Sequence, residues 1–250
     1  MSTSEEVQLP SYNELRRAHK LASLSTDARR LFWTLDGPLA NSIWIMESDH
    51  NPDSLEPYFQ GQKWHRASQS PLTEPKVSSI TVHSDDINRW EDQWLDYHQD
   101  HSEPPDEDEE GEEWDSSMVQ WGALPDYNED EDEEGPAHLL MCCGTKRPRG
   151  KVTSVVVKPT STSFVTVHDY LSTVHPWLLN MRGDLLAVMG LWDDKPLPPE
   201  TKLMVDYNAL ESLKIYNQEE WVRLRRKRPN QLLDAMFLQQ GDAAEKKMED

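Results

Sequence analysis

The chain has 250 residues, a formal net charge of −21 and a mean hydropathy of −0.80, with 36% hydrophobic residues. This composition is too polar for one core that fills the whole length, so we expect part of the chain to be disordered. No window approaches the run of about 18 apolar residues that a membrane-spanning helix needs, and the N-terminus lacks a signal-peptide pattern. A membrane partner is therefore not expected.

The negative charge is concentrated in one segment of the chain. Residues 85–134 hold 22 acidic residues and one basic residue, which leaves 24 of each among the 46 acids and 25 bases of the chain. The remainder is therefore neutral, and the acidity is a property of this segment alone.

Cys142 and Cys143 are the two cysteines of the sequence, and they are adjacent. A disulfide framework is excluded, and a bond between neighbours would be strained. This cysteine usage indicates a reducing compartment, either the nucleus or the cytoplasm.

The first part of the chain predicts short elements separated by turns. Residues 15–24 carry a short helical pattern, and residues 32–35 and 43–45 form two apolar runs typical of buried strands. Residues 49–70 are mostly polar, which predicts a long surface loop. Alternating apolar and polar residues around 80–82 then indicate a half-buried strand.

Two acidic runs, residues 104–115 and 127–135, flank an apolar and aromatic island at residues 118–124. Uncompensated charge at this density resists compaction, so residues 99–137 are expected to form a disordered insertion within one domain. A flexible acidic arm with aromatic anchors favours basic partner proteins, although it could equally be a solubilising spacer. The candidate partner-binding residues are Asp106, Glu107, Asp108, Glu109, Glu110, Trp114, Trp121, Glu129, Asp130, Glu131 and Asp132.

The clearest sequence of strand and helix signals runs from Val152 to Gly190. Residues 155–157 are a β-branched run that predicts a strand, partnered by the strand around 80–82. Thr166 and Asp169 have the spacing of a capping box, and an apolar stripe at helical spacing follows them. Pro176 predicts a kink or a restart near position 175, and Gly190 is a natural stop.

The C-terminal part predicts an edge strand around residues 203–207, a helix from about 218 that Pro229 should break, and a frayed tail. The helix carries a basic cluster that resembles a nuclear-import signal, with a solvated helix face as the alternative. Its members are Arg223, Arg225, Arg226, Lys227 and Arg228. A second basic cluster spans 146–151, and the acidic segment could mask either cluster by folding back onto it at low salt.

The histidines and cysteines give weak signals for a metal site or a catalytic site. His168 and His175 share one side of the predicted helix but lie about 10 Å apart along its axis, too far for one ion. His98 and His101 have a suitable spacing but fall near an expected disordered segment, and the cysteine pair lacks a second CxxC-like partner. No phosphate-binding loop or dinucleotide motif is present. We therefore expect no catalytic residue, no metal and no cofactor.

Three motifs carry a resemblance to a known family. They are LFWTLD at residues 31–36, LTEPKVSSITVHS at 72–84, and the strand and V-T-V-x-D helix start within 153–190, together less than a third of the chain. This succession resembles a family of small fungal proteins that share a domain of unknown function. In that family a Pro-Trp and the third strand closely follow the second strand, whereas here the acidic segment places the third strand about 70 residues later. The resemblance implies an α+β domain in a fungal cell and supplies no catalytic residue.

These signals predict a single α+β domain in which a small, mostly antiparallel sheet packs against a long helix. The expected parts are residues 1–98 and 138–238 of that domain, the acidic insertion at 99–137, and a flexible tail at 239–250. The predicted function is a non-enzymatic interaction module whose acidic arm binds basic protein surfaces, without direct nucleic-acid binding because the arm repels phosphate. The alternative is a small-ligand-binding protein or an enzyme with a pocket between helix and sheet. The oligomeric state stays open.

Overall fold

The computed structural model describes residues 8–102, 118–128, 137–150, 153–193 and 195–226. The chain divides into two compact units. Unit 1 is built from residues 1–83, 154–182 and 200–250, and unit 2 from residues 84–153 and 183–199. The single domain with an acidic insertion stays a prediction from the sequence, and each unit is described by itself.

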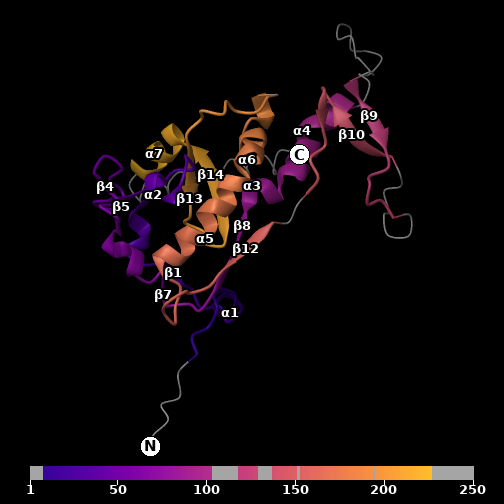
Figure 1. Cartoon of the computed structure of the whole chain (residues 1–250). Coiled ribbons are helices and arrows are strands. Elements are labelled where there is room, and N and C mark those ends of the chain that lie inside the picture. The colour runs from indigo at the N-terminus through magenta and orange to yellow at the C-terminus, as the bar shows by residue number, and fades with distance from the viewer. Residues whose placement is uncertain (1–7, 103–117, 129–136, 151–152, 194, 227–250) are drawn as a thin grey trace, which may run out of the picture. The chain divides into compact units, whose positions relative to one another are not determined.

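Unit 1 is mixed α and β (Figure 1). Its helices are α1 (Tyr12–Arg17), α2 (Leu39–Ser42), α5 (Val167–Asn180) and α7 (Gln218–Arg226), with 3-10 turns η1 (Ala28–Arg30) and η2 (Arg66–Gln69). Its strands are β1 (Ser23–Leu24), β2 (Leu31–Trp33), β3 (Ile43–Met46), β4 (Leu55–Pro57), β5 (Phe59–Gln60), β6 (Lys63–Trp64), β7 (Thr73–Glu74), β8 (Ile80–Ser84), β12 (Ser154–Val157), β13 (Leu203–Asp206) and β14 (Ser212–Asn217).

The sheets of unit 1 are small, and the strand pairs with an assigned register are antiparallel, as the sequence predicts. The largest has the order β12-β8-β14-β13, and Val155 of β12 lies opposite Val82 of β8. A bridge between Thr34 and Met204 joins the β13 edge to the β2-β3-β4 sheet. The expected loop at 49–70 contains β4, β5, β6 and η2, so it is more regular than its polarity suggests.

Helix α5 begins where the capping signal predicts. The backbone N–H of Asp169 donates to the Thr166 hydroxyl at 3.1 Å, and the N–H of Thr166 donates to the Asp169 carboxylate at 2.9 Å. Of the kink or restart expected near residue 175, the restart does not occur: α5 runs unbroken to Asn180 with Pro176 inside it. A proline removes one N–H donor, and the burial of Val174 and Leu178 on either side holds the helix together.

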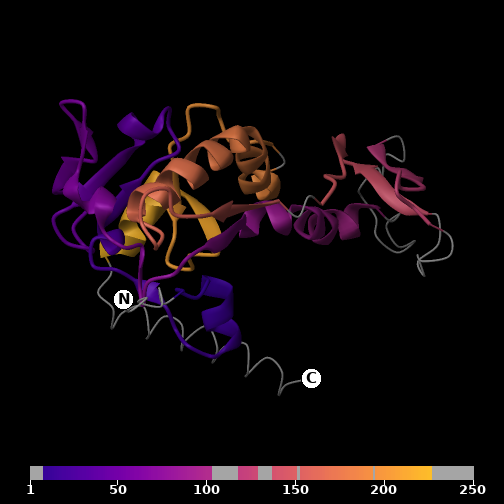
Figure 2. The ribbon, with the colours of Figure 1, turned by 60° about the horizontal axis from the view of Figure 1, so that its bottom comes forward.

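In the described residues, unit 2 contains a small sheet and helices (Figure 2). They are α3 (Asp85–Asn88), α4 (Trp90–Ser102), β9 (Gln120–Gly122), β10 (His138–Cys142), β11 (Thr145–Lys146), α6 (Arg182–Met189) and the 3-10 turn η4 (Leu191–Asp193). The sheet is antiparallel with the order β11-β10-β9. Trp94, Leu139, Cys142 and Leu191 form its buried cluster.

Part of the range 99–137 therefore carries regular structure, namely the end of α4 and strand β9. Trp121 of β9 lies opposite Leu139 of β10, so the apolar island between the acidic runs has a strand partner. The acidic runs at 103–117 and 129–136 lie outside the described residues, and so do Pro229 and the C-terminal tail.

Helix α6 ends at Met189, as Gly190 predicts. A Cβ added at Gly190 would lie 2.0 Å from the carbonyl oxygen of Lys195, so this close approach requires glycine. Among the helices that the structure describes, none is long and apolar enough to cross a membrane.

Candidate functional site

The buried histidine of α5 has a structural role in unit 1. The indole N–H of Trp33 donates to His175 Nδ1 at 3.0 Å, and His175 Nε2 donates to the carbonyl oxygen of Gly37 at 2.9 Å. Burial lowers the pKa of His175, which keeps the ring neutral. Both ring nitrogens are thus engaged in core hydrogen bonds, and the ring is not a ligand candidate.

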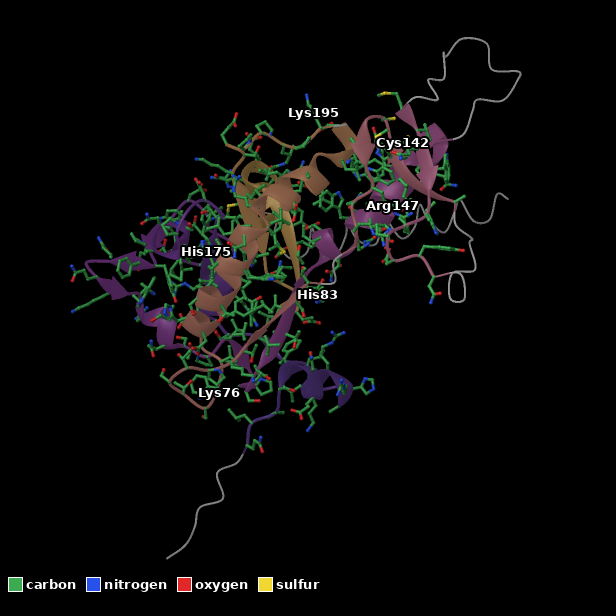
Figure 3. The ribbon with its side chains drawn as sticks, turned by 45° about the vertical axis from the view of Figure 1, so that its right-hand side comes forward. Lys76, His83, Cys142, Arg147, His175 and Lys195 are labelled. Atoms are coloured by element: carbon green, nitrogen blue, oxygen red, sulfur yellow. The ribbon has the colours of Figure 1, made fainter. Side chains whose placement is uncertain are left out.

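His168 lies nearer the surface of the same helix. Its Nδ1 is 3.2 Å from the hydroxyl of Tyr58, and its ring centroid is 4.6 Å from that of Trp64. Burial lowers the pKa of His168 as well. Figure 3 labels His175 among the side chains of unit 1.

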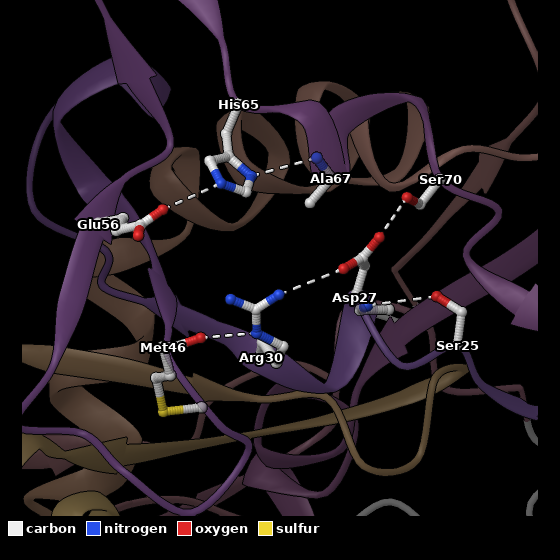
Figure 4. Close-up of polar contacts among 9 residues, drawn as sticks. Ser25, Asp27, Arg30, Met46, Glu56, His65, Ala67 and Ser70 are labelled. Atoms are coloured by element: carbon white, nitrogen blue, oxygen red, sulfur yellow. Dashed lines mark hydrogen bonds and ion pairs between the residues drawn. The ribbon is translucent and has the colours of Figure 1, made fainter.

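A second polar network of unit 1 centres on Asp27 (Figure 4). The hydroxyl of Ser70 donates to Asp27 at 2.5 Å, and Arg30 lies 3.4 Å from the other carboxylate oxygen. The Nε–H of Arg30 also donates to the carbonyl oxygen of Met46 at 2.7 Å. The network ties η1 to β3 and to the segment after η2, so we interpret it as a structural crosslink.

The basic cluster of α7 is only partly available to a partner. The Arg225 guanidinium lies 4.9 Å from the ring of Trp221 and 5.2 Å from that of Tyr207, and the side chain is 11% exposed. The other two described members face acids, with Arg223 near Glu220 at 3.7 Å and Arg226 near Asp53 at 2.6 Å. Lys227 and Arg228 lie outside the described residues.

Of the predicted acidic-arm residues, Trp121 is the one that falls in the described part of the chain. It lies on β9, the edge strand of the unit 2 sheet, and is 51% exposed. Met118, just before the strand, is also exposed. The remaining predicted members lie outside the described residues: Asp106, Glu107, Asp108, Glu109, Glu110, Trp114, Glu129, Asp130, Glu131 and Asp132.

Two acids of the 85–134 segment form ion pairs with arginines of the basic cluster at 146–151. Arg147 Nε donates to Glu91 at 2.6 Å, and both side chains are mostly buried. Arg149 Nη2 donates to both carboxylate oxygens of Asp126, at 2.7 and 2.8 Å. These two pairs involve Glu91 and Asp126, which lie outside the acidic runs 103–117 and 129–136, so masking of the basic cluster by those runs stays a prediction.

Two cavities of the described structure differ in size and lining. A cavity of about 160 Å³ in unit 2 lies between α4, β11 and residues 187–196. That volume is below the range of roughly 300–1,000 Å³ typical of ligand pockets. In unit 1 a larger hollow of about 580 Å³ lies over residues 201–202 and 217–222, where polar side chains dominate the lining.

Unit 2 also brings together three side chains that the sequence treats separately. A ring nitrogen of His98 and the Sγ atoms of Cys142 and Cys143 all lie within 4.8 Å of one another, the one such His/Cys/Asp/Glu cluster found in the described residues. His98 and Cys142 are buried, whereas Cys143 is exposed. Burial, together with the contact to Cys143, raises the pKa of the Cys142 thiol to about 11.

Sequence reasoning missed this cluster because its members are far apart along the chain, on either side of the acidic runs. Two signals were available in the sequence: the spacing between His98 and His101, and the adjacent pair of Cys142 and Cys143. Neither signal is specific alone, and the β10–β11 hairpin at Cys142 and Cys143 was not predicted. Figure 3 labels Cys142 and Arg147, which lie close along the chain in unit 2.

Comparison of the chain with protein-family models, with curated proteins and with solved structures finds no match. The resemblance to small fungal proteins therefore stays a prediction from the motifs. The function is inferred from the geometry of the chain itself.

Proposed function

We propose that the protein is a non-enzymatic interaction module whose acidic segment, in unit 2, binds arginine-rich segments of basic proteins. The observation that carries this proposal is Trp121, a half-exposed tryptophan on an ordered edge strand between the two acidic runs. Tryptophan is among the residues most enriched at the energetic centres of protein interfaces.

Charge and apolar contact have different roles in this proposal. A segment with 22 acids and one base attracts cationic chains over long range and speeds their association. An exposed indole then adds apolar area and a face for a guanidinium group. The two together distinguish a binding arm from a spacer, which needs no fixed aromatic anchor.

The contacts of Arg149 support the choice of arginine as the recognised group. Asp126 already accepts two hydrogen bonds from this guanidinium, and the pair is exposed, with side chains 37% and 71% accessible. Exposed ion pairs contribute at most about 1 kcal/mol, so an arginine of a partner can replace Arg149.

Several finer expectations accompany this proposal. The protein acts in the nucleus or the cytoplasm of a fungal cell, and the basic cluster of α7 is its candidate import signal. The contact of Arg225 with Trp221 weakens the support for that signal, because import requires an accessible basic run.

The contact of α5 with β12 supports the expectation that the long helix packs on the main sheet.

The test is a calorimetric titration of the full chain with a synthetic peptide of Arg-Ser repeats, at low and at high salt. We expect binding that weakens with salt, and loss of binding on deletion of residues 104–135. Trp121→Ala should weaken binding about tenfold or more, as expected for an interface tryptophan.

Trp192→Ala is the matched control, because Trp192 is 65% exposed in the same unit but lies outside the acidic segment. It should leave the affinity unchanged. Equal affinity of the intact and the deleted chain would contradict the proposal, as would the absence of binding at low salt.

A further inference from the structure

We infer that His98, Cys142 and Cys143 form a Zn²⁺ site in unit 2. The inference goes beyond the proposed binding of basic proteins and is independent of it. Thiolate and imidazole are the donors that zinc prefers, and three protein ligands leave one position for water or a further ligand.

The distance between the two sulfur atoms matches a zinc chelate. Cys142 Sγ and Cys143 Sγ are 3.7 Å apart, a separation that also allows an S–H···S hydrogen bond between the two thiols. Two Zn–S bonds of about 2.3 Å at a tetrahedral angle place their sulfur atoms about 3.8 Å apart. A disulfide would require a separation of about 2.05 Å, so the observed spacing suits a shared metal better than a bond between the sulfurs.

The hairpin between β10 and β11 produces this spacing. Neighbouring residues of a strand normally point to opposite faces of the sheet. Cys142 pairs with Thr145, and the two intervening residues, Cys143 and Gly144, have φ values of 49° and 73°. Positive φ at both positions is the pattern of a type I′ turn, and here it brings the Cys143 thiol back toward that of Cys142.

Cysteine is an unusual residue at this turn position. Type I′ turns favour asparagine, aspartate or glycine there, and a left-handed backbone costs other residues about 1–2 kcal/mol. The sequence thus places an exposed thiol where turn formation alone would favour asparagine. Metal coordination gives a reason for the cysteine.

Thr145 orients the third ligand. Its hydroxyl accepts from the indole N–H of Trp94 at 3.1 Å and donates its one proton to the carbonyl oxygen of Cys142 at 2.9 Å. With that proton on the Cys142 carbonyl, His98 Nε2, which lies 3.1 Å from the same hydroxyl, is the donor in that contact. In the neutral ring the lone pair is then on Nδ1, and donation of the other N–H to an outer partner is typical of histidine that binds a metal.

The charge balance suits a partly buried site. Binding replaces the two thiol protons with one Zn²⁺ ion and releases both protons to solvent. Two thiolates and a neutral imidazole around a divalent cation give a complex with no net charge. A neutral complex has a smaller desolvation penalty than a charged one in the environment of buried His98 and Cys142.

The test uses the full chain, reduced and stripped of metal without oxygen, and titrated with Co²⁺ as a spectroscopic probe. We expect one equivalent of Co²⁺ to give thiolate-to-metal charge-transfer absorption and the visible bands of a tetrahedral site. Zn²⁺ should displace it, and competition with a chromogenic chelator gives the Zn²⁺ affinity.

Cys143→Asn separates a ligand from a structural residue, because asparagine suits the turn and the side chain is exposed. The fold should be kept, as circular dichroism would show, while charge-transfer absorption is lost and Zn²⁺ affinity falls by more than about 100-fold. Thr145→Val should weaken Zn²⁺ binding by about 10–100-fold, the range for outer partners of a ligand. His50→Gln, at an exposed histidine of unit 1, should change nothing.

Two outcomes would overturn the inference. One is a reduced full chain that binds Co²⁺ without charge-transfer absorption or does not bind it. The other is a folded Cys143→Asn variant with the Zn²⁺ affinity of the original chain, which would place the ion on other side chains.

Discussion

At the scale of single residues, hydrogen-bond partners decide what each histidine can do. Trp33 donates to one nitrogen of His175 and the other donates to Gly37, so the ring serves as a buried crosslink. The ring of His98 is also buried, and its Nε2 lies 3.1 Å from the hydroxyl of Thr145, beside Cys142 and Cys143. Sequence position alone does not distinguish these two roles.

His175 gives unit 1 a dependence on acid. Its pKa is lowered by burial, so below about pH 6.5 the unfolded state binds more protons than the folded state and stability falls. Above about pH 6.5 the contribution of His175 to the free energy of unfolding does not change with pH. We expect the free energy of unfolding in urea to decrease from pH 7.5 to 5.5, and to decrease less in His175→Gln. An equal decrease in both proteins would assign the effect to other groups such as His168, whose pKa is lowered too.

At the scale of elements, the sequence predicted local signals and one long-range pairing, that of β12 with β8, but not the other strand pairings. The start of α5 follows from Thr166 and Asp169 because a capping box lies within four residues. The β-branched run at 155–157 identifies β12 for the same reason. Strand β14 was missed because its six residues follow a turn without a distinct boundary signal, and β9 because acidic neighbours obscure its three residues.

The candidate site was beyond sequence prediction for a related reason. It depends on the register of β10 and β11 and on the packing of α4 against β10, and neither contact is local in the chain. The acidic arm stays a prediction from charge, whereas the exposure of Trp121 on a strand became known only with its partner Leu139.

Helix α7 offers a test of which basic side chains are structural. Arg225 covers Trp221 and Tyr207, so Arg225→Ala should lower the free energy of unfolding by about 1–2 kcal/mol through lost packing and cation–π contact. Arg226→Ala removes an exposed pair with Asp53 and should cost about 0.5 kcal/mol or less. Denaturant unfolding of both variants measures the difference. Equal losses would mean that Arg225 is only a solvated charge.

At the scale of the whole molecule, the two units differ in what they hold. Unit 1 contains the larger sheets and the buried rings of Trp33, Tyr170 and Tyr207, together with polar groups that the fold itself engages. Unit 2 contains the exposed Trp121 and the cluster of His98 with the two cysteines. It also contains Glu91 and Asp126, which form ion pairs with arginines. This division is the basis of our proposal that unit 2 binds partners while unit 1 supports the fold.

The most direct test of that assignment is hydrogen–deuterium exchange of the full chain, alone and saturated with the Arg-Ser peptide. We expect slower exchange in segments from residues 84–153, above all at 118–128 around Trp121, with exchange in unit 1 unchanged. Slower exchange confined to segments of unit 1, with none in residues 84–153, would contradict the assignment of binding to the acidic segment.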